Sequence, residues 1–196
     1  MKKNNILYLT DRVIYYKGNS IIKYPIKEGI IINTKVANNS KFNKVFKEFI
    51  SSNKLNNSLL GDKIIVIINT TWTKVDMDVL KNILINFNYR RVDFLYDYKY
   101  FRLDSKNAYL NITDNNILLY IIDDYKSIKT VLINSDLFDN LLDKMEYIAR
   151  RIENKELYIL GSGEDLNCFF NNFEDKYNIN TYIFSNHETY LLDSAK

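Results

Sequence analysis

The stretch KIIVIINTTWTKVDMDVLKNILINFNYRRVDFLY, residues 63–96, predicts a strand, a helix and a second strand in immediate succession. Residues 63–69 form a nearly continuous apolar run, which is typical of a strand covered on both faces. Thr73 and Asp76 stand at the spacing of a capping box, so we expect the helix to begin there. Its inner face is predicted from residues at helical spacing: Val75, Val79, Leu80, Ile83 and Leu84. Residues 91–96 have the composition of the next strand, and the whole stretch therefore predicts a β-α-β unit.

Three strands joined by hairpins precede this unit. They are predicted over residues 6–11, 12–17 and 20–24, with a turn at Gly18-Asn19. A helix follows, capped by Asn39 or Ser40. Its buried face is predicted from Phe42, Val45, Phe46, Phe49 and Ile50. The first part of the chain is therefore expected to have the order β-β-β-α-β-α-β.

The same order repeats after about one hundred residues. Strands are predicted over residues 108–113, 116–122, 127–133, 156–160 and 180–184. One helix presents Leu137, Leu141, Leu142, Met145, Ile148, Ala149 and Ile152 on its inner face, and a second spans residues 164–177 with Leu166, Phe169, Phe170 and Phe173 buried. We predict an α/β protein with two mixed sheets, divided into residues 1–103 and 104–196.

Composition excludes several classes of protein. The 196 residues carry 27 basic and 24 acidic side chains, a net charge of +3, so the chain lacks the strongly basic balance of nucleic-acid-binding proteins. Cys168 is the single cysteine, which excludes an intrachain disulfide and fits a cytoplasmic protein. No run approaches the eighteen apolar residues of a membrane-spanning helix.

The duplicated β-β-β-α-β-α-β unit resembles the actin-like ATPase fold, which is related to ribonuclease H. Four segments are similar to the bacterial branch that includes MreB, FtsA and the pilus-assembly protein PilM: IYYKGNSIIKYP, KEGIIINTKVANNSKFNKVFKEFI, KIIVIINTTWTKVDMDVLKNILINFNYRRVDFLYD and ELYILGSGEDLNCFFNNFEDKYNI. The resemblance covers nearly all of the chain. Pro25 leads almost directly to Gly29, and the third strand of the second half leads directly into its helix. The resemblance therefore implies a minimal version that lacks the outer subdomains.

The resemblance also implies a nucleotide cleft between the halves, with one glycine-rich hairpin per half against the phosphates. Glycine lets main-chain N–H groups approach phosphate without a Cβ in the way. Here the first hairpin has no glycine before Gly18, and the second, over residues 108–122, has none. Asn111 stands where the second aspartate is expected. Asp11 and Asp114 occupy the turns, either as substitutes for the aspartates of the family or as ordinary turn residues.

Gly161, Ser162 and Gly163 occupy the position of the adenosine-binding turn in the resemblance. A strand-to-helix turn that needs small residues explains them equally well, and a glycine pair alone is a weak motif. With Asp11, Asn111 and Asp114 they define the candidate vestigial nucleotide cleft.

Three aromatic residues are candidates for binding a partner. Trp72 either anchors a partner or packs over the degenerate cleft. Tyr98 and Tyr100 either form a binding surface or pack between the halves. His187 is predicted to be an exposed loop residue and Cys168 a buried structural thiol, so no catalytic residue and no metal ligand is assigned.

These observations favour a non-catalytic, actin-like scaffold or cytoskeleton-related protein that acts through protein partners in a bacterial pilus, secretion, division or cell-shape assembly. We expect self-association as a further property, no cofactor, no nucleic acid, and membrane recruitment only through a partner. The alternative is a minimal actin-like ATPase that binds ATP and Mg²⁺ between its halves and polymerises.

Overall fold

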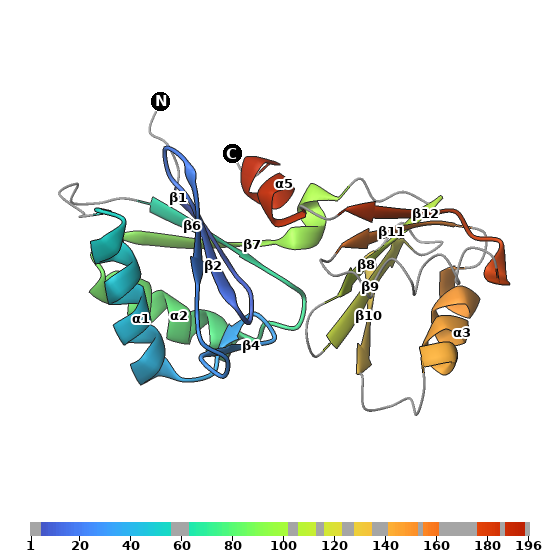
Figure 1. Cartoon of the computed structure of the whole chain (residues 1–196), viewed down its shortest axis with the longest axis horizontal. Coiled ribbons are helices and arrows are strands. Elements are labelled where there is room, and N and C mark those ends of the chain that lie inside the picture. Colours follow the sequence, from blue (N-terminus) through green and yellow to red (C-terminus); the bar gives the residue numbers. More distant parts are fainter. Residues whose placement is uncertain are drawn as a thin grey trace. The chain divides into compact units, whose positions relative to one another are not determined.

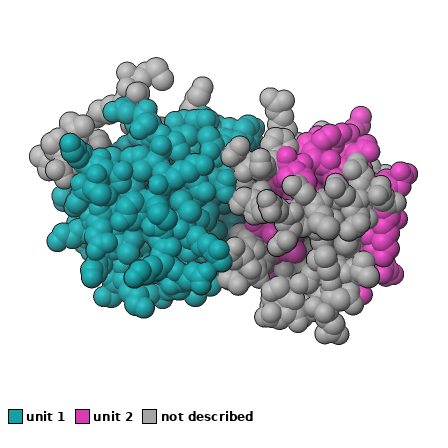
Figure 2. Space-filling model, in the orientation of Figure 1, with its two compact units in different colours: residues 1–100, 188–196 teal, residues 101–187 magenta. Residues whose placement is uncertain are grey.

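A computed structural model describes residues 5–55, 63–101, 106–112, 116–122, 128–134, 141–152, 155–160, 176–184 and 187–194. The chain divides into two compact units (Figure 2). Unit 1 comprises residues 1–100 and 188–196, and unit 2 comprises residues 101–187. Each unit contains a five-stranded mixed sheet, which confirms the predicted duplicated α/β fold. The expected halves, 1–103 and 104–196, did not anticipate the return of the C-terminal residues to unit 1.

The sheet of unit 1 has the strand order β3-β2-β1-β6-β7 (Figure 1). Its strands are β1 (Asn5–Leu9), β2 (Val13–Lys17), β3 (Ile21–Pro25), β6 (Lys63–Ile68) and β7 (Arg91–Tyr96). The first three pair antiparallel, and β6 and β7 continue the sheet in parallel. A short hairpin of β4 (Ile31–Ile32) and β5 (Lys35–Val36) follows β3.

Two helices contribute to the apolar core on one face of this sheet. They are α1 (Asn39–Ser52) and α2 (Lys74–Asn86). Their fully buried residues are Phe42, Phe46, Phe49, Leu80 and Leu84, which join Leu7, Leu9, Ile14, Ile64 and Val66 from the sheet.

The helix starts are partly as predicted. Thr73 caps α2 through a capping box with Asp76, which confirms the prediction. The predicted cap of α1 is wrong by one residue, because Asn38 is the extended residue whose side chain accepts from Lys41 N–H at 2.9 Å. Val75 is also not in the buried stripe. It is 70% exposed, since nine helical residues place it about 180° around the helix from Leu84.

Helix α5 (His187–Ser194) contacts Lys17 of β2, and because the adjacent Tyr16 points into the core with α1 and α2, α5 lies on the opposite face of the unit 1 sheet. Lys17 Nζ donates to Leu192 O at 3.1 Å and to Asp193 Oδ1 at 2.9 Å, and Leu191 and Leu192 are fully buried. The prediction that His187 lies in a loop is therefore wrong: it begins a helix that is stabilised by docking rather than by its own short length. The side chain of His187 lies outside the described residues.

Unit 2 repeats the sheet, in the order β10-β9-β8-β11-β12. Its strands are β8 (Asn107–Ile112), β9 (Asn116–Ile122), β10 (Ile128–Asn134), β11 (Glu156–Leu160) and β12 (Thr181–Phe184). Helix α3 (Leu141–Ile152) contributes Ile148 and Ile152 to the core on one face. Of the helix predicted over residues 164–177, all but the last two residues lie outside the described residues.

The connections that would hold outer subdomains are short in both units. Residues 26–38, between β3 and α1, contain the small β4–β5 hairpin, and residues 135–140 separate β10 from α3. Neither connection is long enough in sequence for a folded subdomain.

Candidate functional site

A buried polar network lies at the carboxyl ends of β1 and β6 in unit 1. Its centre is Thr34 in the β4–β5 turn, which is 3% exposed. Thr34 N–H donates to Asp11 Oδ1 at 2.9 Å. The Thr34 hydroxyl oxygen accepts from Asn69 Nδ2 at 3.1 Å and from the Trp72 indole N–H at 2.9 Å. Through its main-chain N–H and its hydroxyl, this one residue connects the first hairpin turn, the β4–β5 turn and the loop after β6.

The backbone of this turn is unusual for its sequence. Asn33 and Thr34 have φ angles of 54° and 66°, the left-handed conformation of a two-residue type I′ hairpin turn. A β-branched residue rarely adopts this conformation. The three hydrogen bonds of Thr34 offset the cost, since strained residues persist where their surroundings over-determine them.

A second group of hydrogen bonds joins the network to helix α2. Asn69 Oδ1 accepts from the main-chain N–H of Thr71 at 3.0 Å and from its hydroxyl at 2.6 Å. Lys35 Nζ donates to Thr71 O at 2.6 Å and pairs with Asp76 at 3.0 Å. Although partial burial opposes ionisation of Asp76, hydrogen bonds from Thr73 and Lys35 lower its pKa below the usual value.

Asp11 lies in a tight turn that is closed by its own hydrogen bonds. Thr10 N–H donates to Val13 O at 3.0 Å, and Val13 N–H donates to the Thr10 hydroxyl oxygen at 3.0 Å. The Asp11 carboxylate binds the β4–β5 turn through Thr34. These contacts give Asp11 a structural part within unit 1, in the turn where the resemblance expects a phosphate loop.

Of the candidate cleft residues in unit 2, the structure describes Asn111. It lies in β8, is 1% exposed, and is in register with Leu118 and Leu160 on the neighbouring strands. Asp114 and the turn Gly161, Ser162 and Gly163 lie outside the described residues, as does Cys168. Since Asp11 and Asn111 belong to different units, the convergence of the six residues in one site stays a prediction.

Trp72 belongs to the core of unit 1. It is 5% exposed, and its ring lies 6.3 Å from that of Phe94 between centroids. With its N–H bonded to Thr34, the indole contributes to packing and to the polar network within the unit.

Tyr98 and Tyr100 lie in the short 3-10 helix η1 (Asp97–Tyr100), and both are half-buried. Tyr98 stacks on Tyr96 with ring centroids 5.3 Å apart. Burial, together with Tyr96 and Asp97, raises the pKa of Tyr98, and burial raises that of Tyr100. Both phenols are therefore neutral hydrogen-bonding groups at physiological pH.

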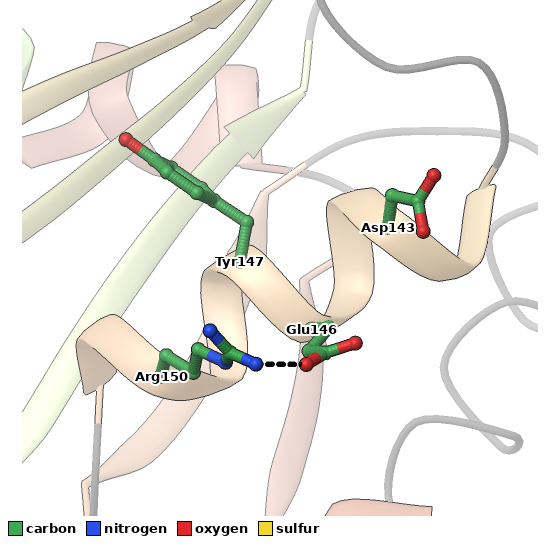
Figure 3. A pocket seen from close by; sticks show the side chains of 4 residues that line it. All are labelled: Asp143, Glu146, Tyr147 and Arg150. Atoms are coloured by element: carbon green, nitrogen blue, oxygen red, sulfur yellow. Dashed lines mark hydrogen bonds and ion pairs between the residues drawn. The ribbon is translucent and has the colours of Figure 1, made fainter.

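A shallow depression of about 210 Å³ lies on α3 of unit 2 and is lined by Asp143, Glu146, Tyr147 and Arg150. Figure 3 shows the Glu146 and Arg150 side chains forming an ion pair on one side of the helix, while Tyr147 extends from another. The guanidinium of Arg151 lies 4.4 Å from the Tyr147 ring centroid. Because the lining residues that the structure describes all come from one helix, and two of them neutralise each other, this depression is a surface feature rather than a catalytic arrangement.

A row of aromatic rings that the sequence pattern did not predict crosses the unit 2 sheet. The rings of Tyr109 and Tyr158 stack at 5.0 Å, and those of Tyr158 and Tyr182 at 4.9 Å. Phe101 stacks on Tyr109 at 4.9 Å and meets Tyr120 edge-on at 5.6 Å. The sequence does place one tyrosine in each of four predicted strands. Only the register of the strands shows that these four tyrosines lie side by side.

Within the part of the chain that the structure describes, no three acidic, histidine or cysteine side chains are grouped closely enough to hold a metal ion. The described helices include none that is long and apolar enough to cross a membrane.

The fold is similar to several solved structures. No protein-family model and no curated protein sequence matches the chain. A Bacteroides thetaiotaomicron protein with an actin-like ATPase fold and unknown function is 10% identical, with a TM-score of 0.63 over 98% of this chain and 96% of the other. MreB5 of Spiroplasma citri bound to ADP is 11% identical, with a TM-score of 0.67 over 99% and 95%. The Alp12 filament structure is 9% identical, with a TM-score of 0.55 over 98% and 97%.

These structures, together with the two-fold repeated topology, define the class. The chain has the actin-like ATPase fold, as the sequence predicted. At these identities the similarity concerns the fold, and function depends on the site.

Proposed function

We propose that this protein is a non-catalytic, actin-like scaffold that acts by binding other proteins in a bacterial cytoskeletal, pilus, secretion or division assembly. The observation that carries this proposal is the closed turn around Asp11. Its carboxylate accepts from Thr34, and the turn is joined by hydrogen bonds between Thr10 and Val13.

The physical reason is that a phosphate-binding site requires free main-chain N–H groups. Main-chain N–H groups must point at the phosphate oxygens, and glycine permits the close approach. The first turn has no glycine, and two of its main-chain N–H groups, those of Thr10 and Val13, already donate within the turn. To expose them to a phosphate would cost the hydrogen bonds that hold the hairpin, about 1 kcal/mol for each.

Binding surfaces of the kind that scaffolds use are available on unit 1. Tyr98 and Tyr100 are half-buried, and tyrosine suits interfaces because it offers a large rigid ring with one polar end. We assign to this pair the role of contacting a protein partner in the cytoplasm. Self-association is the other form of protein contact, and it has a precedent in the structurally similar Alp12 filament.

Calorimetric titration of the full chain with ATP and Mg²⁺ tests the proposal. We expect no heat of binding at ATP concentrations of about 1 mM, well above the micromolar affinity of a working site. Binding at micromolar strength that disappears in the Gly161→Asp variant would contradict it.

The alternative function is a minimal ATPase that binds MgATP between its halves and changes conformation or polymerises. It is favoured by the likeness to MreB5, which was solved with ADP and with AMPPNP. This function requires Asp11, Asn111, Asp114 and the turn at residues 161–163 to converge. Phosphate release that depends on Mg²⁺ and is lost in Asp11→Ala would establish it. Sedimentation that yields only monomers or dimers with ATP present would exclude the filament.

A further inference from the structure

The two sheets differ in how their edges are protected. An edge strand exposes unpaired main-chain groups, and charged residues or proline on it discourage pairing with another chain. In unit 1, β3 carries Lys23 and Pro25. At the other edge, β7 carries Arg91 and Asp93, and the Asp93 carboxylate pairs with Arg91 at 3.0 Å and with Lys63 at 2.9 Å. Both edges of this sheet are therefore protected.

The edge strand β12 of unit 2 has no such protection. Its sequence, Thr-Tyr-Ile-Phe, contains neither a charged residue nor a proline. Tyr182 is 43% exposed and Ile183 is 38% exposed. The opposite edge, β10, also exposes two apolar residues, Ile128 at 41% and Leu132 at 49%, but it carries Lys129 within the strand. Of the four sheet edges, β12 is the one best suited to pairing.

The row of tyrosines ends at this edge. The strand register places Tyr120, Tyr109, Tyr158 and Tyr182 directly opposite one another across β9, β8, β11 and β12. The ring of Tyr182 stacks with one face on Tyr158, and among the strands that the structure describes none lies beside its other face. A further aromatic residue at the same register would continue the stack, and cross-strand aromatic pairs stabilise sheets.

We propose that β12 pairs with β12 of a second copy of this chain, antiparallel and around a two-fold axis through Tyr182. Side chains of a strand alternate between the two faces of the sheet, so odd-numbered and even-numbered residues lie on opposite faces. A two-fold axis normal to the sheet must pair residues that lie on the same face, and the numbers of each such pair have an even sum. Pairing Tyr182 with Tyr182 of the second copy satisfies this condition. It joins the two tyrosine rows into one and places Ile183 opposite Thr181.

The main-chain geometry agrees with this register. Leu157 N–H donates to Asn180 O at 2.9 Å, so alternate residues of β12, beginning with Asn180, bond to β11. The main-chain groups of Ile183 therefore face the open edge. Tyr182 takes the non-hydrogen-bonded position of the new pair, where opposing side chains lie closest, as an aromatic pair requires.

The proposed contact is small, and its symmetry limits the assembly to two copies. A four-residue strand buries little area, so we expect a weak dimer. An isologous two-fold contact uses the same surface on both copies and stops at two. This inference goes beyond the scaffold function and is independent of nucleotide, since it rests on unit 2 alone.

Sedimentation velocity of the full chain at about 10 to 300 µM tests the proposal, a range chosen for a small interface. We expect a concentration-dependent dimer, and we expect Tyr182→Lys to raise its dissociation constant by at least about tenfold, because two lysines would then oppose each other. Leu132→Lys, the matched exposed apolar site on the other edge, should dimerise like the wild type. A wild type that stays monomeric over this range, or a loss of the dimer only in Leu132→Lys, would overturn the assignment.

A crosslinking experiment checks the register without relying on the stability of Tyr182→Lys. In a Cys168→Ser background, Tyr182→Cys should form a disulfide dimer upon mild oxidation, because cross-strand neighbours at a non-hydrogen-bonded position lie within disulfide distance. Tyr190→Cys, a tyrosine of similar exposure on α5, serves as the control. Equal crosslinking of the two variants would overturn the proposed register.

Discussion

Replacing Thr34 with valine removes the centre of the polar network while keeping the shape of the side chain. The hydroxyl oxygen accepts two hydrogen bonds, from Asn69 Nδ2 at 3.1 Å and from the Trp72 indole at 2.9 Å. Both donor residues are buried, at 3% and 5% exposure, so water cannot replace the lost acceptor. A buried donor left without a partner costs about 1–3 kcal/mol. We therefore expect Thr34→Val to lower the free energy of unfolding of unit 1 by about 2–4 kcal/mol.

The assay is urea denaturation followed by tryptophan fluorescence. Trp72 is the only tryptophan, so its emission reports on unit 1 specifically. Thr34→Ser keeps the hydroxyl and removes the branch that strains the left-handed backbone, so it should equal or exceed the wild type in stability. Thr130→Val, a β10 substitution in unit 2, should leave the fluorescence transition unchanged. A Thr34→Val midpoint equal to that of the wild type would refute the role assigned to the network.

Three further outcomes follow from other contacts. Burial and then the charge of Glu188 raise the pKa of Tyr15 to about 12, so Tyr15 loses its proton at a lower pH in the unfolded state than in the folded state. The free energy of unfolding should therefore stay constant below about pH 10 and fall by about 2 kcal/mol toward pH 12. Chemical denaturation would measure this loss, which Tyr15→Phe should reduce. Leu191→Ala on α5 should cost about 2–4 kcal/mol by the Trp72 transition, and no change would mean that α5 is not docked. Asp76→Asn should cost about 1 kcal/mol at pH 7 through the loss of its capping and Lys35 contacts. Since these contacts lower the Asp76 pKa, the difference from the wild type should vanish as the pH falls below about 4, and a constant difference would contradict this origin.

Much of the fold could be predicted because the local signals were strong. The strands at residues 91–96, 116–122 and 156–160 have the predicted bounds, since apolar alternation and polar turns mark both ends of each. The capping box at Thr73 fixed the start of α2 for the same local reason.

The features that escaped prediction depend on long-range contacts. The role of Asp11 comes from Thr34, 23 residues away, and nothing local distinguishes Asp11 from an ordinary turn residue. Helix α5 is short, and the face that it covers belongs to the other end of the chain, through Lys17. The tyrosine row becomes visible only after the strands are placed in register, because Tyr109 and Tyr182 lie on separate segments of the chain.

The central claim is that an actin-like fold is retained here without a working phosphate site. The most direct test is the free energy of unfolding of the full chain with and without about 1 mM MgATP, because a ligand that binds the native state at one hundred times its dissociation constant stabilises it by about 2.7 kcal/mol. We predict no change in either the Trp72 fluorescence transition or the circular dichroism transition. A stabilisation of about 2.7 kcal/mol, which corresponds to a dissociation constant of about 10 µM and should disappear in Gly161→Asp, would contradict the claim.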